Sequence, residues 1–187
     1  MKYFNDNIIS HTRCWIEQVV IELHLCPFAR QPFESGKVRF VVSAADQPEM
    51  LRADLQRELE FLHSTNANDV QTTLLIHPEV LKEFLNYNDF LDVADALIKE
   101  QGYAGEFQVA SFHPGYQFAG TPPDAAENYT NRSPYPTLHL LREESVEHAL
   151  HSYAHPEEIP ERNIRTLNSL GAEHMREVLS QCMRSES

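Results

Sequence analysis

Histidines at the ends of predicted strands are the first candidates for chemistry in this sequence. His77 and His113 each follow a run of strand-forming residues and precede a proline, and His139 lies inside a further run of this kind. If strands 72–76 and 107–112 are parallel, both strand-end imidazoles lie at the carboxyl edge, where open α/β sheets bind ligands. We expect His113 to move a proton in catalysis, assisted by His77 or His139. The alternative is that His77 and His113 only hydrogen-bond to loop carbonyls.

The connection between the last two predicted strands, residues 113–136, is long. It contains five prolines and four tyrosine or phenylalanine residues, and it has neither helical nor strand periodicity. Connections of this length are uncommon in compact domains and often carry function. We expect an ordered loop that either covers a binding site or forms a rigid structural flap.

Arg132 is the only lysine or arginine in this loop. A guanidinium held by a proline-stiffened loop can bind a carboxylate or phosphate through two hydrogen bonds. We therefore expect Arg132 to point into a cleft near a histidine and to bind a small anion. The alternative is an ion pair with Asp124 or Glu127 that holds the loop in place. The expected ligand-binding residues are Arg132, Asn128, Asn131, Tyr116 and Tyr129.

The sequence offers no motif for a metal or a cofactor. It contains no H-x-H, H-E-x-x-H or C-x-x-C pattern and no glycine-rich phosphate-binding pattern. His148 and His151 are three residues apart, but such a pair is more typical of a solvated helix face. We expect neither a metal nor a cofactor.

The cysteines Cys14, Cys26 and Cys182 are expected to be reduced thiols, because an odd number without a framework suits a reducing compartment. Cys26 follows a predicted helix, and the negative end of a helix dipole raises a thiol pKa. We expect Cys26 to react slowly and not to serve as a nucleophile.

Hydrophobic periodicity predicts the elements that position these residues. Strands are expected over residues 38–43, 72–76, 107–112 and 137–141. Helices are expected over residues 6–25, 46–62, 145–153 and from about 160 onward, with two helical pieces inside 79–100 that are separated at 86–89. This order predicts an α/β fold: one domain, residues 1–187, with a central mixed sheet of about four strands, three parallel and one antiparallel, flanked by helices.

Charge and hydropathy narrow the range of partners. The net charge is −13, with no cluster of basic residues, which disfavours nucleic acid. No apolar stretch approaches the roughly 20 residues that span a bilayer, and the first ten residues do not form a signal peptide. We expect a cytoplasmic protein whose partner is a small anionic molecule, with no membrane or nucleic-acid partner.

Three groups of residues resemble a known family. They are Leu25-Cys26-Pro27-Phe28-Ala29, Phe112-His113-Pro114, and Asn131-Arg132-Ser133-Pro134-Tyr135-Pro136 followed by Leu138-His139-Leu140-Leu141-Arg142-Glu143. With these motifs the chain resembles an uncharacterised bacterial family that is catalogued only as a domain of unknown function. The resemblance implies no reaction, ligand or catalytic residue.

Two functional hypotheses follow from the sequence. The first is an enzyme that acts on a small anionic metabolite at a His/Arg site beneath the loop 113–136. The second is a non-catalytic binding or protein-interaction module that uses the aromatic residues of this loop. A convergent polar pocket beneath the loop would favour the first hypothesis, and a flat aromatic patch would favour the second.

Overall fold

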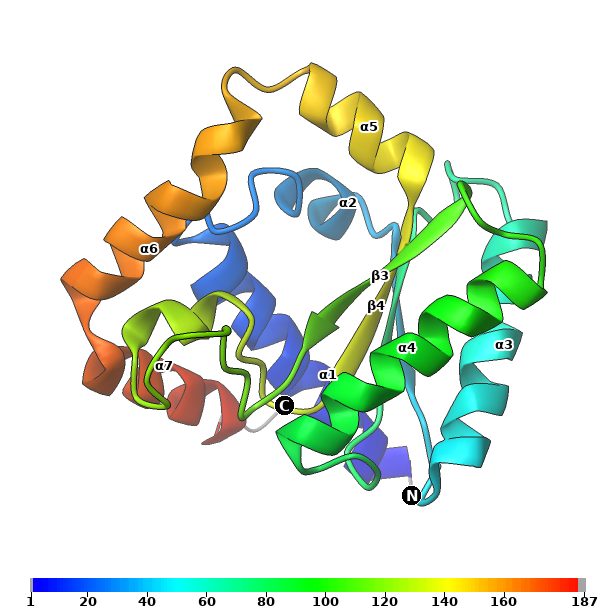
Figure 1. Ribbon diagram of the computed structural model, residues 1–187, viewed down its shortest axis with the longest axis horizontal. Helices are drawn as coiled ribbons and strands as arrows, with labels where there is room; N and C mark the ends of the chain where they lie inside the picture. Colours follow the sequence, from blue (N-terminus) through cyan, green and yellow to red (C-terminus); the bar gives the residue numbers. More distant parts are fainter. Residues whose placement is uncertain (1, 185–187) are drawn as a thin grey trace.

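A computed structural model describes residues 2–184 of the chain, which form one four-stranded sheet with helices on both faces (Figure 1). The strands are β1 (Val38–Val42), β2 (Thr72–Ile76), β3 (Phe107–Phe112) and β4 (Thr137–Arg142), in the spatial order β1-β2-β4-β3. The α/β class and the four predicted strands are confirmed.

The pairing of the strands differs from the predicted pairing. Within the described residues only β1 and β2 form a parallel pair, because β4 lies between β2 and β3 and is antiparallel to both. The predicted parallel pairing of 72–76 with 107–112 is therefore wrong. Since β2 and β3 are each antiparallel to β4, they still run in the same direction, and their carboxyl ends reach the same edge of the sheet.

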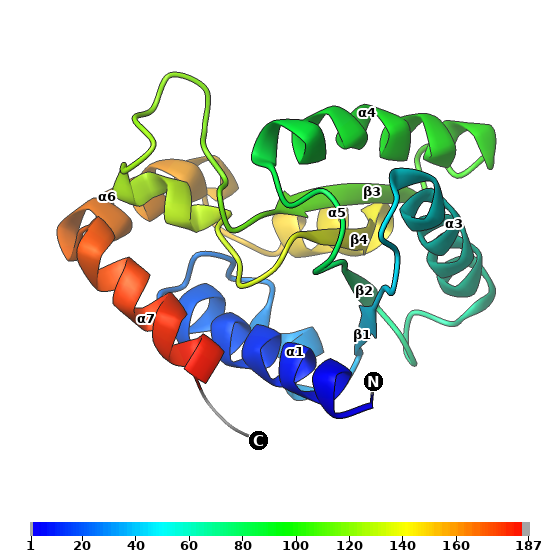
Figure 2. The ribbon, with the colours of Figure 1, turned by 90° about the horizontal axis from the view of Figure 1, so that it is seen from below.

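One face of the sheet is covered by α3 (Pro48–Ser64) and α4 (Phe84–Glu100) (Figure 2). Pro48 begins α3, where its missing N–H costs nothing. The predicted leucine stripe of this helix is fully buried against the sheet; it consists of Leu51, Leu55, Leu59 and Leu62.

The helix α4 is continuous, although the sequence predicted a break at 86–89. Residues 78–83 are not helical, and Leu81 has a positive φ of 55°. Tyr87 and Phe90 turn their rings into the core from the first two turns of α4. Burial of these two aromatic side chains outweighs the low helix propensity of the neighbouring Asn and Asp residues.

The opposite face packs on α1 (Lys2–Trp15) and on the π-helical turn η1 (Ile16–Ile21) that continues it. The chain then forms the short helix α2 (Arg30–Glu34) before β1. Beyond β4 come α5 (Glu143–His151), η3 (Pro156–Glu158), α6 (Ile159–Leu170) and α7 (Ala172–Arg184). The single last helix expected from the sequence is thus two helices, which Gly171 separates with a φ of 83°.

Figures 1 and 2 show α7 beside α1. The helices α5 and α2 lie on the same side of the sheet as α1, at the end of the sheet where β4 ends. The loop 113–136 contains a short 3-10 helix, η2 (Ala126–Thr130), which packs against α6 and α7. Among residues 2–184, no helix combines the length and the apolar character that crossing a membrane requires.

Candidate functional site

The two strand-end histidines lie together with Tyr87 at the carboxyl edge of β2 and β3. The Tyr87 ring centroid is 5.7 Å from that of His77 and 5.0 Å from that of His113. Both imidazoles lie on the face covered by α4. Side chains an even number of positions apart along a strand point to the same face, and this relates His77 to the core residue Leu75 and His113 to the core residue Phe107. We call His77, Tyr87 and His113 the strand-end cluster.

Backbone groups satisfy most of the polar atoms in the strand-end cluster. His77 Nδ1 donates to the carbonyl of Val80 at 3.0 Å. His113 Nε2 donates to the carbonyl of Leu81 at 3.1 Å, and its Nδ1 accepts from the N–H of Gly115 at 2.9 Å. These contacts agree with the alternative considered above, in which the two histidines hold loop carbonyls.

The strand-end cluster is closed to solvent. His77 is 0% and His113 is 1% exposed. Burial lowers the pKa of both imidazoles, that of His77 to about 4, so both are neutral near neutral pH. The Tyr87 hydroxyl donates to the carbonyl of Thr137 and accepts from the N–H of Phe112. This geometry stabilises the junction of α4 with three strand ends.

Arg132 is bound by its own loop. Its Nε donates to the carbonyl of Tyr116 at 3.0 Å and its Nη2 to that of Pro123 at 2.6 Å, and its guanidinium lies 4.8 Å from the centre of the Tyr129 ring. These donors hold backbone carbonyls, where the sequence suggested an anion or the carboxylates of Asp124 and Glu127.

The other expected ligand-binding residues also serve the loop. Asn128 is fully buried; its Oδ1 accepts from the N–H of Phe118 and the hydroxyl of Thr121, and its Nδ2 donates to the carbonyl of Pro122. Asn131 Nδ2 donates to the carbonyl of Ser111. The Tyr116 ring packs on Phe84 and Phe118, and Tyr129 belongs to the core.

The third predicted catalytic residue, His139, lies on the opposite face of the sheet from His77 and His113. Its neighbours Leu138 and Leu140 point into the core beneath α3 and α4, so His139 points the other way. The sheet therefore separates the three histidines that the sequence grouped together. The register of β4 accounts for the separation. His139 is paired with Leu74 of β2 and Ala110 of β3, and directly paired residues share a face of the sheet. His77 is instead in line with Leu75, which points to the other face.

His139 lines a cavity of about 530 Å³ between the sheet, the segment that contains α2, and α5. The volume lies within the range of small-molecule sites. We call it the His139 cavity. Its wall is mostly apolar and includes Trp15, Ile16, Val20, Pro27, Phe28, Phe33, Leu74, Ala110, Phe112, Leu141, Val146 and Tyr153. Each of the three groups that carry the family resemblance contributes residues to the wall of the His139 cavity. The loop 113–136 contributes none.

The hydrogen bonds of His139 define its tautomer. The Thr72 hydroxyl has one proton, which it donates to the carbonyl of Leu140 at 2.6 Å. The 2.7 Å contact between Thr72 Oγ1 and His139 Nε2 therefore requires a proton on Nε2. His139 Nδ1 carries a lone pair, and within residues 2–184 it has no hydrogen-bond partner and is not fully buried. Since the ring lines the cavity, Nδ1 can accept a hydrogen bond from a molecule bound there.

The cavity is electrically neutral around His139. Burial lowers the pKa of His139 to about 4, which leaves the imidazole uncharged near neutral pH. Burial also raises the pKa of the Cys26 thiol, and the backbone N–H groups of Phe28 and Ala29 offset this rise only in part. Cys26, which also lines the cavity, is therefore a neutral thiol at neutral pH.

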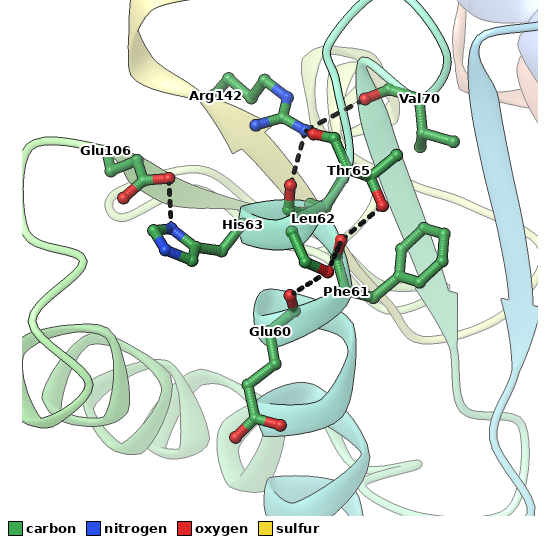
Figure 3. A network of polar contacts seen from close by, with 9 residues as sticks. Glu60, Phe61, Leu62, His63, Thr65, Val70, Glu106 and Arg142 are labelled. Atoms are coloured by element: carbon green, nitrogen blue, oxygen red, sulfur yellow. Dashed lines mark hydrogen bonds and ion pairs between the residues drawn. The ribbon is translucent and has the colours of Figure 1, made fainter.

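Arg142 also borders the cavity; one nitrogen of its guanidinium is bound elsewhere, and its Nε is buried without a hydrogen-bond partner among residues 2–184. One guanidinium nitrogen donates to the carbonyls of Leu62 and Thr65, each at 2.7 Å, and to that of Val70 at 3.2 Å (Figure 3). Carbonyls at the end of a helix have no intrahelical partner, and a cation there stabilises the helix. Arg142 thus closes α3 and fixes the turn before β2.

Sequence reasoning did not identify most of this wall. Trp15, Phe28 and Tyr153 come from separate segments, and each fits a helical or core pattern by itself. Phe28 and Tyr153 meet edge to face with their ring centres 5.6 Å apart. The one available signal was the resemblance, because its groups 25–29, 112–114 and 138–143 converge on the cavity. Within residues 2–184 no cluster of three or more His, Cys, Asp or Glu side chains could hold a metal ion.

Comparison with known proteins gives one match. The model of a family described as a protein of unknown function, DUF1415, matches residues 7–177. No curated protein and no solved structure matches the chain.

Proposed function

The chain belongs to the DUF1415 family, whose description names no activity, and from the His139 cavity we propose that it binds a small, uncharged, largely apolar molecule. The ligand would carry one hydrogen-bond donor for His139 Nδ1. The observation that carries the proposal is this neutral imidazole, which offers one unpaired acceptor inside an otherwise mostly apolar cavity of about 530 Å³.

The electrostatics favour an uncharged ligand over the anionic metabolite expected from the sequence. A buried charge without a partner is costly. The His139 imidazole and the Cys26 thiol are neutral, and one nitrogen of the Arg142 guanidinium is bonded to three carbonyls. His148, the other imidazole in the wall, is exposed to solvent. The overall charge of −13 adds no attraction for an anion.

The same groups favour binding over catalysis. A catalytic acid or base is most effective when its pKa is near the working pH. The pKa of His139 is about 4, and burial moves the pKa of Cys26 upward, away from neutrality. Neither group is poised for proton transfer or nucleophilic attack, whereas both are suited to a low-dielectric binding site.

Two matched fluorescent probes test the proposal. N-phenyl-1-naphthylamine is neutral, apolar and has one N–H donor; its analogue 8-anilinonaphthalene-1-sulfonate adds a negative charge to the same framework. We expect the neutral probe to bind with the higher affinity. Trp15, the only tryptophan of the chain, lines the cavity and should transfer its excitation energy to the bound probe.

Two pairs of variants locate the binding site. Ala149→Phe would fill the cavity from α5 and abolish binding, whereas Leu150→Phe, at the next and exposed position, would not. His139→Phe should weaken binding of the neutral probe about 3- to 10-fold through loss of one hydrogen bond, and should not affect 1-phenylnaphthalene, which has no donor. Preferential binding of the sulfonate, or binding that Ala149→Phe leaves unchanged, would refute the proposal.

A further inference from the structure

Two cysteines meet where the first and last helices pack together. Cys14 in α1 donates through its Sγ to the Sγ of Cys182 in α7, with 2.6 Å between the two sulfur atoms. The helices lie side by side in both ribbon views (Figures 1 and 2). Neither residue lines the His139 cavity, so this pair is independent of the proposed function.

The packing holds the two sulfur atoms near bonding distance. A disulfide has an S–S bond of about 2.05 Å, so bond formation requires only a small shift of the side chains. Cys182 is 1% exposed and Cys14 is half-buried. Next to the two cysteines the interface between α1 and α7 is apolar. Trp15 of α1 and Met175 of α7 are fully buried there and belong to one core cluster.

We propose that Cys14 and Cys182 are a site of reversible oxidation, at which a disulfide joins α1 to α7. The oxidant is a low-molecular-weight disulfide, RSSR. The thiolate of Cys14 attacks one of its sulfur atoms, which forms a mixed disulfide and releases one RS⁻. Cys182 then loses its proton to solvent and attacks the Cys14 sulfur, and the second RS⁻ leaves. In total, two protein thiols and RSSR yield one protein disulfide and two RSH.

The surroundings of the two thiols assign their order of reaction. Cys14 is the accessible member and meets the oxidant first. Burial raises the pKa of Cys182 to about 12, and its contact with Cys14 adds to the rise, so Cys182 acts as the resolving thiol. Its low thiolate fraction slows the second exchange, but the sulfur atoms are already in contact, which gives this step a high effective concentration.

Oxidation should stabilise the fold, because the disulfide would close a loop that spans most of the chain. Long loops lose the most unfolded-state entropy when they are cross-linked. For a domain of this size we expect the melting temperature of the oxidised protein to exceed that of the reduced protein by about 10 °C.

The test uses the full chain, reduced and then incubated with glutathione disulfide. We expect intact-mass analysis to show the loss of two hydrogen atoms without added glutathione, and peptide mapping to join the peptides of Cys14 and Cys182. Dithiothreitol should reverse both results. Cys26→Ser should form the same cross-link at the same rate, whereas Cys14→Ser and Cys182→Ser should each stop at a glutathione adduct or not react.

Three outcomes would overturn the proposal: a stable glutathione adduct on Cys14 in the unsubstituted protein, a cross-link that includes Cys26, or a covalent dimer. If Cys182→Ser does not fold, Cys182→Ala and the time course of the unsubstituted protein provide the same comparison. An oxidised protein that melts at the temperature of the reduced protein would refute the predicted stabilisation.

Discussion

The strand-end cluster and the His139 cavity both contain neutral imidazoles whose pKa is lowered by burial, yet they differ in what their nitrogen atoms contact. In the strand-end cluster backbone groups bind both nitrogens of His113 and one nitrogen of His77. The second nitrogen of His77 has no partner among the described residues, but it is buried and closed to solvent. In the cavity one nitrogen of His139 is held by Thr72 and the other is open. A perturbed histidine pKa therefore reports burial in both regions, and only the open nitrogen distinguishes a binding site from a structural junction.

The comparison predicts its largest effect on stability at the centre of the strand-end cluster. Tyr87→Ala removes a fully buried ring and two hydrogen bonds, and we expect a loss of about 3–5 kcal/mol in the free energy of unfolding. Phe28→Ala in the cavity wall should cost about 1 kcal/mol, because Phe28 is only half-buried, and should weaken binding of the neutral probe. Urea denaturation and probe titration measure both quantities. If Tyr87→Ala and Phe28→Ala lowered the free energy of unfolding equally, the strand-end cluster would not contribute more to stability than the cavity wall.

The second prediction concerns pH and the same cluster. The pKa of His77 is about 4 in the folded chain and 6.5 in the unfolded chain, so the unfolded chain binds the additional proton between these values. Stability is therefore full above pH 6.5 and falls as the pH drops toward 4, by at most about 3 kcal/mol for this residue. Melting temperatures measured across this range should fall less steeply in His77→Gln. The matched control, His174→Gln at an exposed position of α7, should keep the slope of the unsubstituted protein.

The smallest of the three effects is expected in the loop. Arg132→Ala should lower the free energy of unfolding by about 1–2 kcal/mol, since it removes two hydrogen bonds to carbonyls and the contact with the Tyr129 ring. Binding of the neutral probe should not change. An anion site at Arg132 predicts the reverse pattern, an unchanged melting temperature together with lost affinity for a carboxylate or phosphate, so thermal denaturation and anion titration of this variant decide between the two roles.

Local patterns predicted local structure well. The leucine stripe of α3 appears in the structure as expected, and Pro48 begins the helix as its position indicated. Where tertiary packing competes with propensity, the prediction was wrong: Tyr87 and Phe90 keep α4 continuous through its Asn and Asp residues.

The candidate site depended on information that is not local. His77, His113 and His139 could each be identified as strand-associated residues, but their grouping depends on which strands are neighbours. That pairing is made by β4, which contacts β2 across more than sixty residues of sequence. The cavity wall combines residues of the first helix, α2, α5 and all four strands, and no single segment has a pattern that reveals the shared space.

The position of β4 also has a consequence for the order of folding. During synthesis β1 and β2 can pair as soon as Ile76 has emerged, but β3 has no neighbour until β4 follows it. Until residue 142 is available, β2 and β3 expose unpaired backbone edges, which other chains can join. Pairing across such sequence distances is slow. The nascent chain is therefore most vulnerable to aggregation while the loop 113–136 is being made, and addition of the single strand β4 ends this period for both neighbours at once.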